Sequence, residues 1–214
     1  NISIIGEDRE LTIIDGNQSG TVVKIEGPSS TIGSARLESI TITNGTGEST
    51  YAGLGGTYAG GIFMNKGSTV LNNLIVHNNS SADYAAGIFG SGTGLVISNS
   101  IIYDNTSGDD GGGVYLLNSA DVKINNNLFY GNSGSDGGGL SIQGSDVLIN
   151  NCTVSNNGNY GLFLGVNSTV NISETVLFNN SSYEIKFRQN NGTADLDIEY
   201  SIIEDEQDSI YING

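Results

Sequence analysis

The sequence contains very few of the residues on which compact metalloproteins and disulfide-bonded domains depend. It has one cysteine, one proline, one histidine and no tryptophan, and only 7 of its 214 residues are lysine or arginine. Because Cys152 is the single cysteine, the chain can form neither a disulfide framework nor a thiolate metal site. We expect Cys152 to be a small residue in or near the core. The absence of a cysteine–histidine cluster excludes a zinc centre.

The shortage of cations leaves the chain strongly acidic, with a formal net charge of −16. Such a surface repels nucleic-acid phosphates and anionic lipid headgroups, so we expect no nucleic-acid partner. No apolar run approaches the roughly 20 residues that a membrane-spanning helix needs, so we expect no direct membrane insertion. An acidic surface is compatible with divalent cations, with neutral glycans, or with solubility alone.

What the sequence does contain is a repeat. The first motif of the repeat is two small residues followed by an apolar residue. Its second small residue stands at positions 61, 87, 113 and 139, so the motif recurs every 26 residues. The phase returns at Gly161 and Glu184, after steps of 22 and 23 residues. An alternating strand ending in apolar-x-x-Asn follows each start, and its final residues are Asn79, Asn105, Asn132, Asn157 and Asn180. Two motifs that keep phase in this way indicate a repeat architecture.

The composition of the repeat predicts its fold. Short alternating runs rich in Val and Ile, bounded by Gly, Asn, Ser and Asp, are typical of strands and turns. A period in the twenties corresponds to one solenoid rung of about three short strands, which buries its apolar side against neighbouring rungs at roughly 4.8 Å spacing. We therefore predict an all-β fold: a right-handed, single-stranded parallel β-helix of about 8 rungs, each of roughly 22–27 residues.

The predicted β-helix forms one domain over residues 1–214, with an insertion loop at Thr46–Tyr58 and no obvious end caps. Uncapped ends expose strand edges. Two explanations stay open at this point: the domain was cut from a longer chain, or its ends associate with other subunits.

Asparagine recurs at one corner of the repeat, as Asn73, Asn99, Asn126 and Asn151. Asparagine tolerates the left-handed backbone conformation of sharp corners, and its amide can bond to the rungs above and below. We therefore predict a structural asparagine ladder at these positions.

Aspartates recur in the turn before the Gly-Gly starts, as Asp83, Asp109, Asp110 and Asp136. In successive rungs their charges repel one another unless a cation lies between them. Calcium accepts carboxylate and turn carbonyl oxygens without strict geometry, so a Ca²⁺ site is one interpretation. The other is that aspartate was selected for turn formation alone. No other cofactor is expected.

The sequence predicts no catalytic residues. Lys186 and Arg188 are the only cations that are close in sequence and share a strand face, and we interpret them as solvated surface charges rather than as catalytic groups. Asp109 and Asp110 are adjacent, which does not give the roughly 5–9.5 Å carboxylate separation that glycosidases use. His77 is expected to stack with Tyr103 and Tyr130 in the next rungs.

The Gly-Gly-apolar starts and apolar-x-x-Asn corners resemble the repeats of polymorphic outer-membrane-type autotransporter passengers, which combine a GG-apolar motif with F-x-x-N. This chain carries the latter as Phe129-Tyr130-Gly131-Asn132. The chain is also similar to pectin-lyase-like parallel β-helix proteins, whose first rungs residues 4–16 resemble. The resemblance implies an exported, surface-associated protein. It implies little about activity, because this scaffold carries lyases, hydrolases, adhesins and phage fibres.

Three functions follow from these observations. The first is a non-catalytic extracellular or cell-surface module, structural or adhesive, with a glycan or a surface protein as partner. The second is a carbohydrate-active enzyme, a polysaccharide lyase above all, with Lys186 and Arg188 as candidate residues. The third is a filament subunit that associates end to end.

Overall fold

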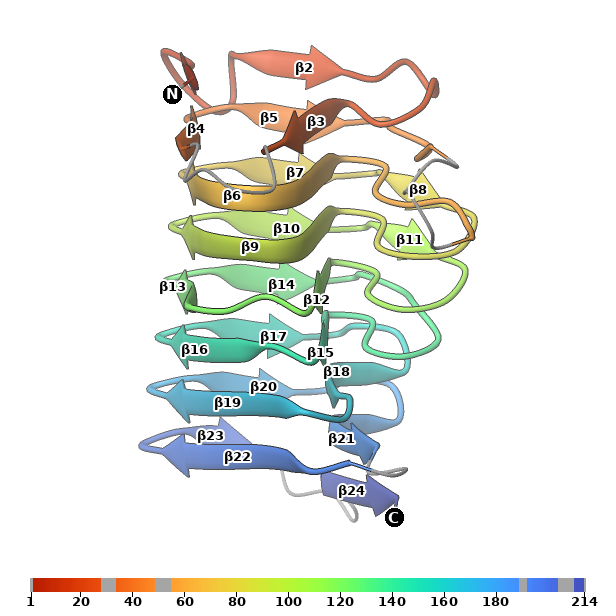
Figure 1. The fold of residues 1–214 in the computed structure, drawn as a ribbon, viewed down its shortest axis with the longest axis vertical. Helices are drawn as coiled ribbons and strands as arrows, with labels where there is room; N and C mark the ends of the chain where they lie inside the picture. The colour runs from red at the N-terminus through yellow and green to blue at the C-terminus, as the bar shows by residue number, and fades with distance from the viewer. Residues whose placement is uncertain (1, 28–33, 49–54, 189–191, 204–209, 214) are drawn as a thin grey trace.

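The computed structural model describes residues 2–27, 34–48, 55–188, 192–203 and 210–213. These residues form three parallel sheets and no helix, and successive rungs stack along the long axis of the molecule (Figure 1). The predicted all-β parallel solenoid is confirmed. Among the described residues, no helix is long and apolar enough to cross a bilayer.

The largest sheet has fourteen strands, and each complete rung contributes a first and a second strand to it. The first strands are β3 (Val23–Glu26), β12 (Val114–Leu117), β15 (Leu140–Gln143), β18 (Tyr160–Leu164), β21 (Tyr183–Arg188) and β24 (Ile210–Asn213). The second strands are β1 (Ile2–Ile5), β4 (Ser34–Glu38), β13 (Val122–Asn125), β16 (Asp146–Asn150), β19 (Ser168–Ser173) and β22 (Ala194–Glu199). In two rungs the two strands are continuous, as β6 (Ile62–Asn72) and β9 (Ile88–Ser98).

The second sheet has eight strands, one from each rung, in agreement with the predicted number of rungs. These are β2 (Ile13–Asp15), β5 (Thr41–Thr43), β7 (Ile75–His77), β10 (Ile101–Tyr103), β14 (Leu128–Tyr130), β17 (Thr153–Ser155), β20 (Val176–Phe178) and β23 (Ile202–Ile203). A two-stranded sheet at the side of the stack pairs β8 (Ser80–Ser81) with β11 (Thr106–Ser107).

The core lies between the two larger sheets and is built from columns of aliphatic side chains in register. Ile97, Ile124 and Ile149 are one such column, and none is more than 2% exposed. Because alternate residues of a strand face opposite sides, the alternation seen in the sequence directs every second residue into this core. Cys152 is also buried, at 3% exposed, as expected.

The Gly-Gly motif follows from close packing between rungs. A Cβ atom on Gly113 would lie 2.5 Å from the carbonyl oxygen of Gly139 and 3.2 Å from the amide of Asn132. Only glycine leaves room for the neighbouring backbone and for an asparagine side chain beneath it. The two motifs of the repeat are therefore one packing unit.

The insertion predicted at Thr46–Tyr58 is described only at its two ends, because residues 49–54 lie outside the described residues. Glu48 and Tyr58 form an antiparallel bridge across it. The outermost rungs expose apolar side chains, with Ile2 69%, Leu11 80% and Ile202 65% exposed. End-to-end association stays a prediction.

Candidate functional site

One face of the stack changes character where the loops between the second sheet and the next first strand become shorter. These loops span 80–86, 106–112 and 133–138 in three successive rungs, but only 158–160 and 181–183 in the next two. The loops near β8 and β11 project farther from the stack than those below them (Figure 1). On the outward face of the first strands, the side chains are buried from Phe63 down to Phe163, half-buried at Lys186, and exposed at Tyr211.

The outward face of the first strands, which we call the strand-one face, carries an unusual column of side chains. From the first described rung downward the column is Lys24, Phe63, Phe89, Tyr115, Ser141, Phe163, Lys186 and Tyr211. The rings of Phe63 and Phe89 are 5.3 Å apart, and Tyr58 from the insertion packs against Phe89 at 4.9 Å. The upper part of the face is thus a second, smaller hydrophobic core.

Asp110 lies where this aromatic column ends. Its side chain is buried, its Oδ2 accepts a hydrogen bond of 3.1 Å from Gln143, and its Oδ1 has no hydrogen-bond partner. Burial, followed by the charges of Asp109 and Asp136, raises its pKa to about 7, against the opposing effects of Arg188 and of a hydrogen bond from Tyr115. A carboxyl group that titrates near neutrality is suited to proton transfer.

Arg188 closes this site from below. Its guanidinium forms an ion pair with Asp136, two rungs above, and lies 4.9 Å from the centre of the Phe163 ring. Arginine can combine an ion pair with a contact over an aromatic ring in this way because its guanidinium is planar. Ser141, between Tyr115 and Phe163 in the column, is fully buried.

Lys186 is also held within the protein. Its Nζ donates a hydrogen bond of 2.6 Å to the Tyr160 hydroxyl and lies 4.4 Å from the centre of that ring. Tyr183 stacks on Tyr160 at 5.9 Å and on Tyr211 at 4.9 Å. The cation pair noted in the sequence is therefore part of an aromatic and polar cluster.

The four aspartates considered for calcium do not converge on one point. Asp83 accepts a hydrogen bond of 2.7 Å from the Thr57 backbone, and Asp109 is exposed. Asp110 and Asp136 are neighbours in adjacent rungs, but Arg188 supplies the positive charge beside them. Among the described residues, no three His, Cys, Asp or Glu side chains form a group that could hold a metal ion. Calcium binding at these positions stays a prediction.

The corner asparagines Asn73, Asn99, Asn126 and Asn151 all have positive φ, between 49° and 57°. Amide hydrogen bonds run from Asn151 to Asn126 at 2.7 Å and from Asn126 to Asn99 at 3.3 Å. The two upper asparagines donate to residues outside this column: Asn99 donates to Asn72, and Asn73 donates to Ser39. These bonds are at the surface.

A longer ladder lies inside the molecule, and the sequence analysis did not recognise it as one. It consists of the final residues of the apolar-x-x-Asn motif, Asn79, Asn105, Asn132, Asn157 and Asn180. The Oδ1 of Asn79 accepts from the backbone N–H of Gly45. In the other four, Oδ1 accepts from the backbone N–H and from the side-chain amide of the asparagine one rung above, as Asn132 does from Asn105 at 3.1 and 2.9 Å. The last member, Asn180, donates to the carboxylate of Glu184. The signal that could have identified it is the apolar residue three positions earlier, which fixes the asparagine on the inner side of the corner.

His77, Tyr103 and Tyr130 form the stack expected from the sequence. Their ring centres are 4.8 and 4.9 Å apart and the rings are parallel within 2°. Burial lowers the pKa of His77, more than Asp104 raises it. His77 belongs to the eight-stranded sheet, whereas the strand-one face near Asp110 belongs to the fourteen-stranded sheet.

The sequence matches the family described as "Right handed beta helix region" over residues 13–199. The chain belongs to the right-handed β-helix family. Its fold is similar to that of the periplasmic alginate epimerase AlgG, with a TM-score of 0.53 and 12% identity, over 84% of this chain and 42% of the epimerase. The A-module of the Azotobacter vinelandii mannuronan C-5 epimerase AlgE4 aligns with a TM-score of 0.36 and 14% identity, over 99% of this chain and 83% of that one.

The family match establishes the right-handed β-helix. The likeness to AlgG, at 12% identity, shows the fold alone. The chain spans 42% of the length of AlgG. No curated protein sequence matches this member of the β-helix family.

Proposed function

We propose that this chain is a non-catalytic structural and adhesive module of a secreted or cell-surface protein, and that it holds polysaccharide without altering it. The observation that carries the proposal is the closure of the strand-one face. The groups able to transfer a proton there are buried, with Asp110 6% and Tyr115 4% exposed. A polysaccharide can rest against this face, but it does not reach these buried groups.

The interior of the rod supports a structural role. The buried asparagine ladder ties five successive rungs together, and each amide also bonds to a backbone carbonyl of the rung before it, as Asn132 does to Ile102 at 2.9 Å. Satisfied buried amides rigidify a core because breaking one leaves unpaired polar groups without water. Such a rod maintains the spacing between whatever lies at its two ends.

Export to the cell exterior is supported by the resemblance of the repeats to autotransporter passengers and by the periplasmic location of one protein of similar fold. A surface of net charge −16 also suits a protein that must stay dispersed.

The proposal is tested by offering the purified chain alginate, polygalacturonate, xylan and a neutral β-glucan with Ca²⁺ present. Retention by immobilised polymer measures binding, while newly formed chain ends and proton NMR of the uronate C5 position measure chemistry. We expect retention on at least one polymer and no change in any of them. New chain ends or inverted C5 centres would refute a non-catalytic role.

A carbohydrate-active enzyme is the second candidate, and the raised pKa of Asp110 is the observation that favours it. The likeness in fold to an alginate epimerase makes a uronate polymer the substrate to try first. For this function Arg188 must leave Asp136 and expose the carboxyl group. Activity that increases in Arg188→Ala and disappears in Asp110→Asn would establish the enzyme.

A further inference from the structure

A second surface of the β-helix has the form of a binding groove and lies apart from the strand-one face. It follows the outward face of the second strands β13, β16, β19 and β22 and consists of two shallow hollows of about 220 and 230 Å³ that share Asn171. We call it the second-strand groove. The side chains that matter for the argument are Lys123, Asp146, Leu148, Thr169, Asn171 and Asp197.

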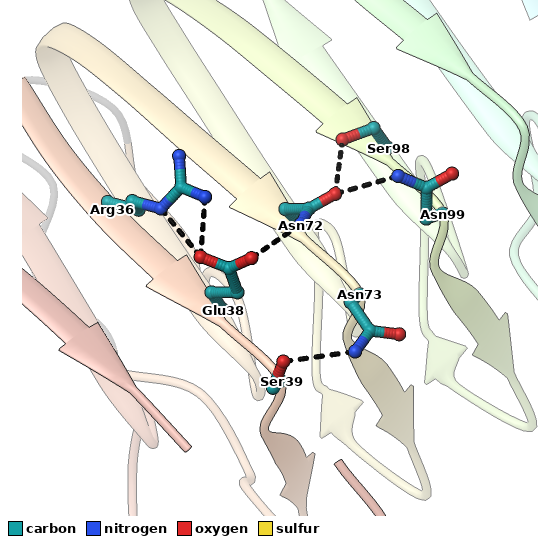
Figure 2. Close-up of polar contacts among 7 residues, drawn as sticks. All are labelled: Arg36, Glu38, Ser39, Asn72, Asn73, Ser98 and Asn99. Carbon is teal, nitrogen blue, oxygen red and sulfur yellow. Dashed lines mark hydrogen bonds and ion pairs between the residues drawn. The ribbon is translucent and has the colours of Figure 1, made fainter. Parts of the chain in front are cut away.

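In the upper rungs the polar side chains at the corner end of this face bond to one another. Figure 2 shows Arg36 and Asn72 both bound to Glu38, and Ser98 and Asn99 both donating to Asn72. The Asn72–Glu38 distance is 2.9 Å and the Ser98–Asn72 distance is also 2.9 Å. These donors and acceptors are already occupied.

In the lower rungs the column nearest the corner still has a hydrogen bond, from Asn150 to Ser173 at 2.8 Å, but in the part of the chain that the structure describes the outward side chains two residues earlier on the strands have none. Within the described residues, the side chains of Asp146, Asn171 and Asp197 form no hydrogen bond or ion pair with the protein. Leu148, between them in the stack, is 47% exposed. The groove therefore offers amide, hydroxyl and carboxylate groups around an apolar floor.

The charge of the groove selects against polyanions. Four acidic side chains, of which Asp146 and Asp197 are two, line the two hollows together with one cation, Lys123. A uronate or sulfated polymer would add like charges at distances where repulsion is strong. Hydroxyl groups, in contrast, can donate to the carboxylates and accept from Asn171, Thr169 and Lys123.

The spacing of the rungs selects a glycan over an extended peptide. Equivalent side chains repeat along the groove at the rung spacing of roughly 4.8 Å, whereas side chains on one face of an extended peptide repeat every two residues, roughly 6.6 Å. Each pyranose ring of an extended β-linked glycan advances the chain by about one rung. A glycan parallel to the axis thus presents one ring to each rung.

We propose that the second-strand groove binds a neutral, extended, β-linked oligosaccharide along the axis of the stack, with Leu148 beneath a sugar ring and Asn171 bonded to its hydroxyl groups. The inference rests on the proposed adhesive function and assigns its ligand class and its site. It assigns the binding of neutral glycans to the second strands, away from the Arg188 site.

Isothermal titration of the whole chain with cellohexaose, a mannuronate hexamer and a glucosamine hexamer tests this. We expect cellohexaose to bind, and Leu148→Ala and Asn171→Ala each to weaken binding about tenfold, the value of one buried contact or hydrogen bond. Val96→Ala is the matched control, because Val96 lies in the same outward column as Lys123 but outside the hollows. Its affinity should equal that of the unaltered chain.

Three results would overturn the proposal in distinguishable ways. Binding of cellohexaose that survives both groove variants but is lost in Arg188→Ala would place the ligand on the strand-one face. Binding of the mannuronate or glucosamine hexamer without cellohexaose would refute the neutral class while leaving an adhesive function intact. If no glycan binds although circular dichroism shows a folded chain, both this inference and the proposed function fail.

Discussion

Asp110→Asn should stabilise the folded chain at alkaline pH more than at acidic pH. The pKa of Asp110 is raised from an ordinary value of 3.8 to about 7 in the folded chain. Between these two values the unfolded chain has released this proton and the folded chain keeps it, so stability falls as pH rises. Each pKa unit corresponds to about 1.4 kcal/mol, which gives a loss of up to about 4 kcal/mol once the pH exceeds 7.

Asparagine reproduces the shape of the protonated acid, accepts from Gln143 and cannot ionise. Because the chain is isoelectric near pH 4.1, the measurement is best made at pH 5 and pH 8. Over that interval the unaltered chain should lose about 2.5 kcal/mol through this group, and the variant should not. The advantage of the variant should therefore grow by that amount.

Urea unfolding followed by far-ultraviolet circular dichroism is the assay, since the chain has no tryptophan. Asp146→Asn is the matched control: it removes an exposed carboxylate and should change stability equally at both pH values. If Asp110→Asn shifts the free energy of unfolding by the same amount at pH 5 and pH 8, the carboxyl group does not carry a raised pKa and the description of the site is wrong.

Two further changes test other parts of the structure. Asn132→Ala should lower the free energy of unfolding in urea by about 3–5 kcal/mol, because it leaves the backbone N–H and the amide of Asn105 buried without this acceptor. Asn126→Ala, at the surface, should lower it by less than about 1 kcal/mol. Equal losses would contradict the assignment of the inner ladder as the main one. Arg188→Ala should leave the chain folded and raise the pKa of Asp110 further, because the variant removes a positive charge that lowers this pKa. Carboxyl ¹³C NMR measures the titration of Asp110. An unchanged or lower pKa would show that Arg188 does not act on Asp110.

The period of the sequence was sufficient to predict the solenoid, because every rung must place the same residue types at the same corner to stack. It was not sufficient to distinguish the two asparagine columns. Asn126 and Asn132 recur with equal regularity, and only the coordinates show that the first points outward from a corner of positive φ while the second is buried. The consequence is that the ladder was predicted at the more exposed of the two positions.

The candidate site was harder to predict, for a different reason. Lys186 and Arg188 were recognised as a pair on one strand, and Asp110 and Asp136 as members of one column. The contact that joins the two sets spans 52 residues and two rungs. Its formation depends on the reach of one arginine side chain and on the short loop at 158–160, whose shortening is visible in the sequence but whose effect on exposure is not.

The length of these loops decides what the β-helix can do. In the upper rungs Tyr58 from the insertion and Tyr84 from the loop at 80–86 pack over the aromatic column. Asp110, in the loop at 106–112, is buried, which raises the pKa of its carboxyl group and removes it from solvent. Below the short loops the face is partly exposed, with Lys186 and Arg188 half-buried and Tyr211 38% exposed. A single side chain, Arg188, bridges the two regions. Asp110 and the partly exposed side chains thus belong to different rungs, and under the proposed function a polysaccharide on this face would meet cations and aromatic rings before it met an acid. That arrangement favours holding a polymer over cutting it, and it makes the Arg188–Asp136 ion pair the contact whose loss would most change the chemistry of the molecule.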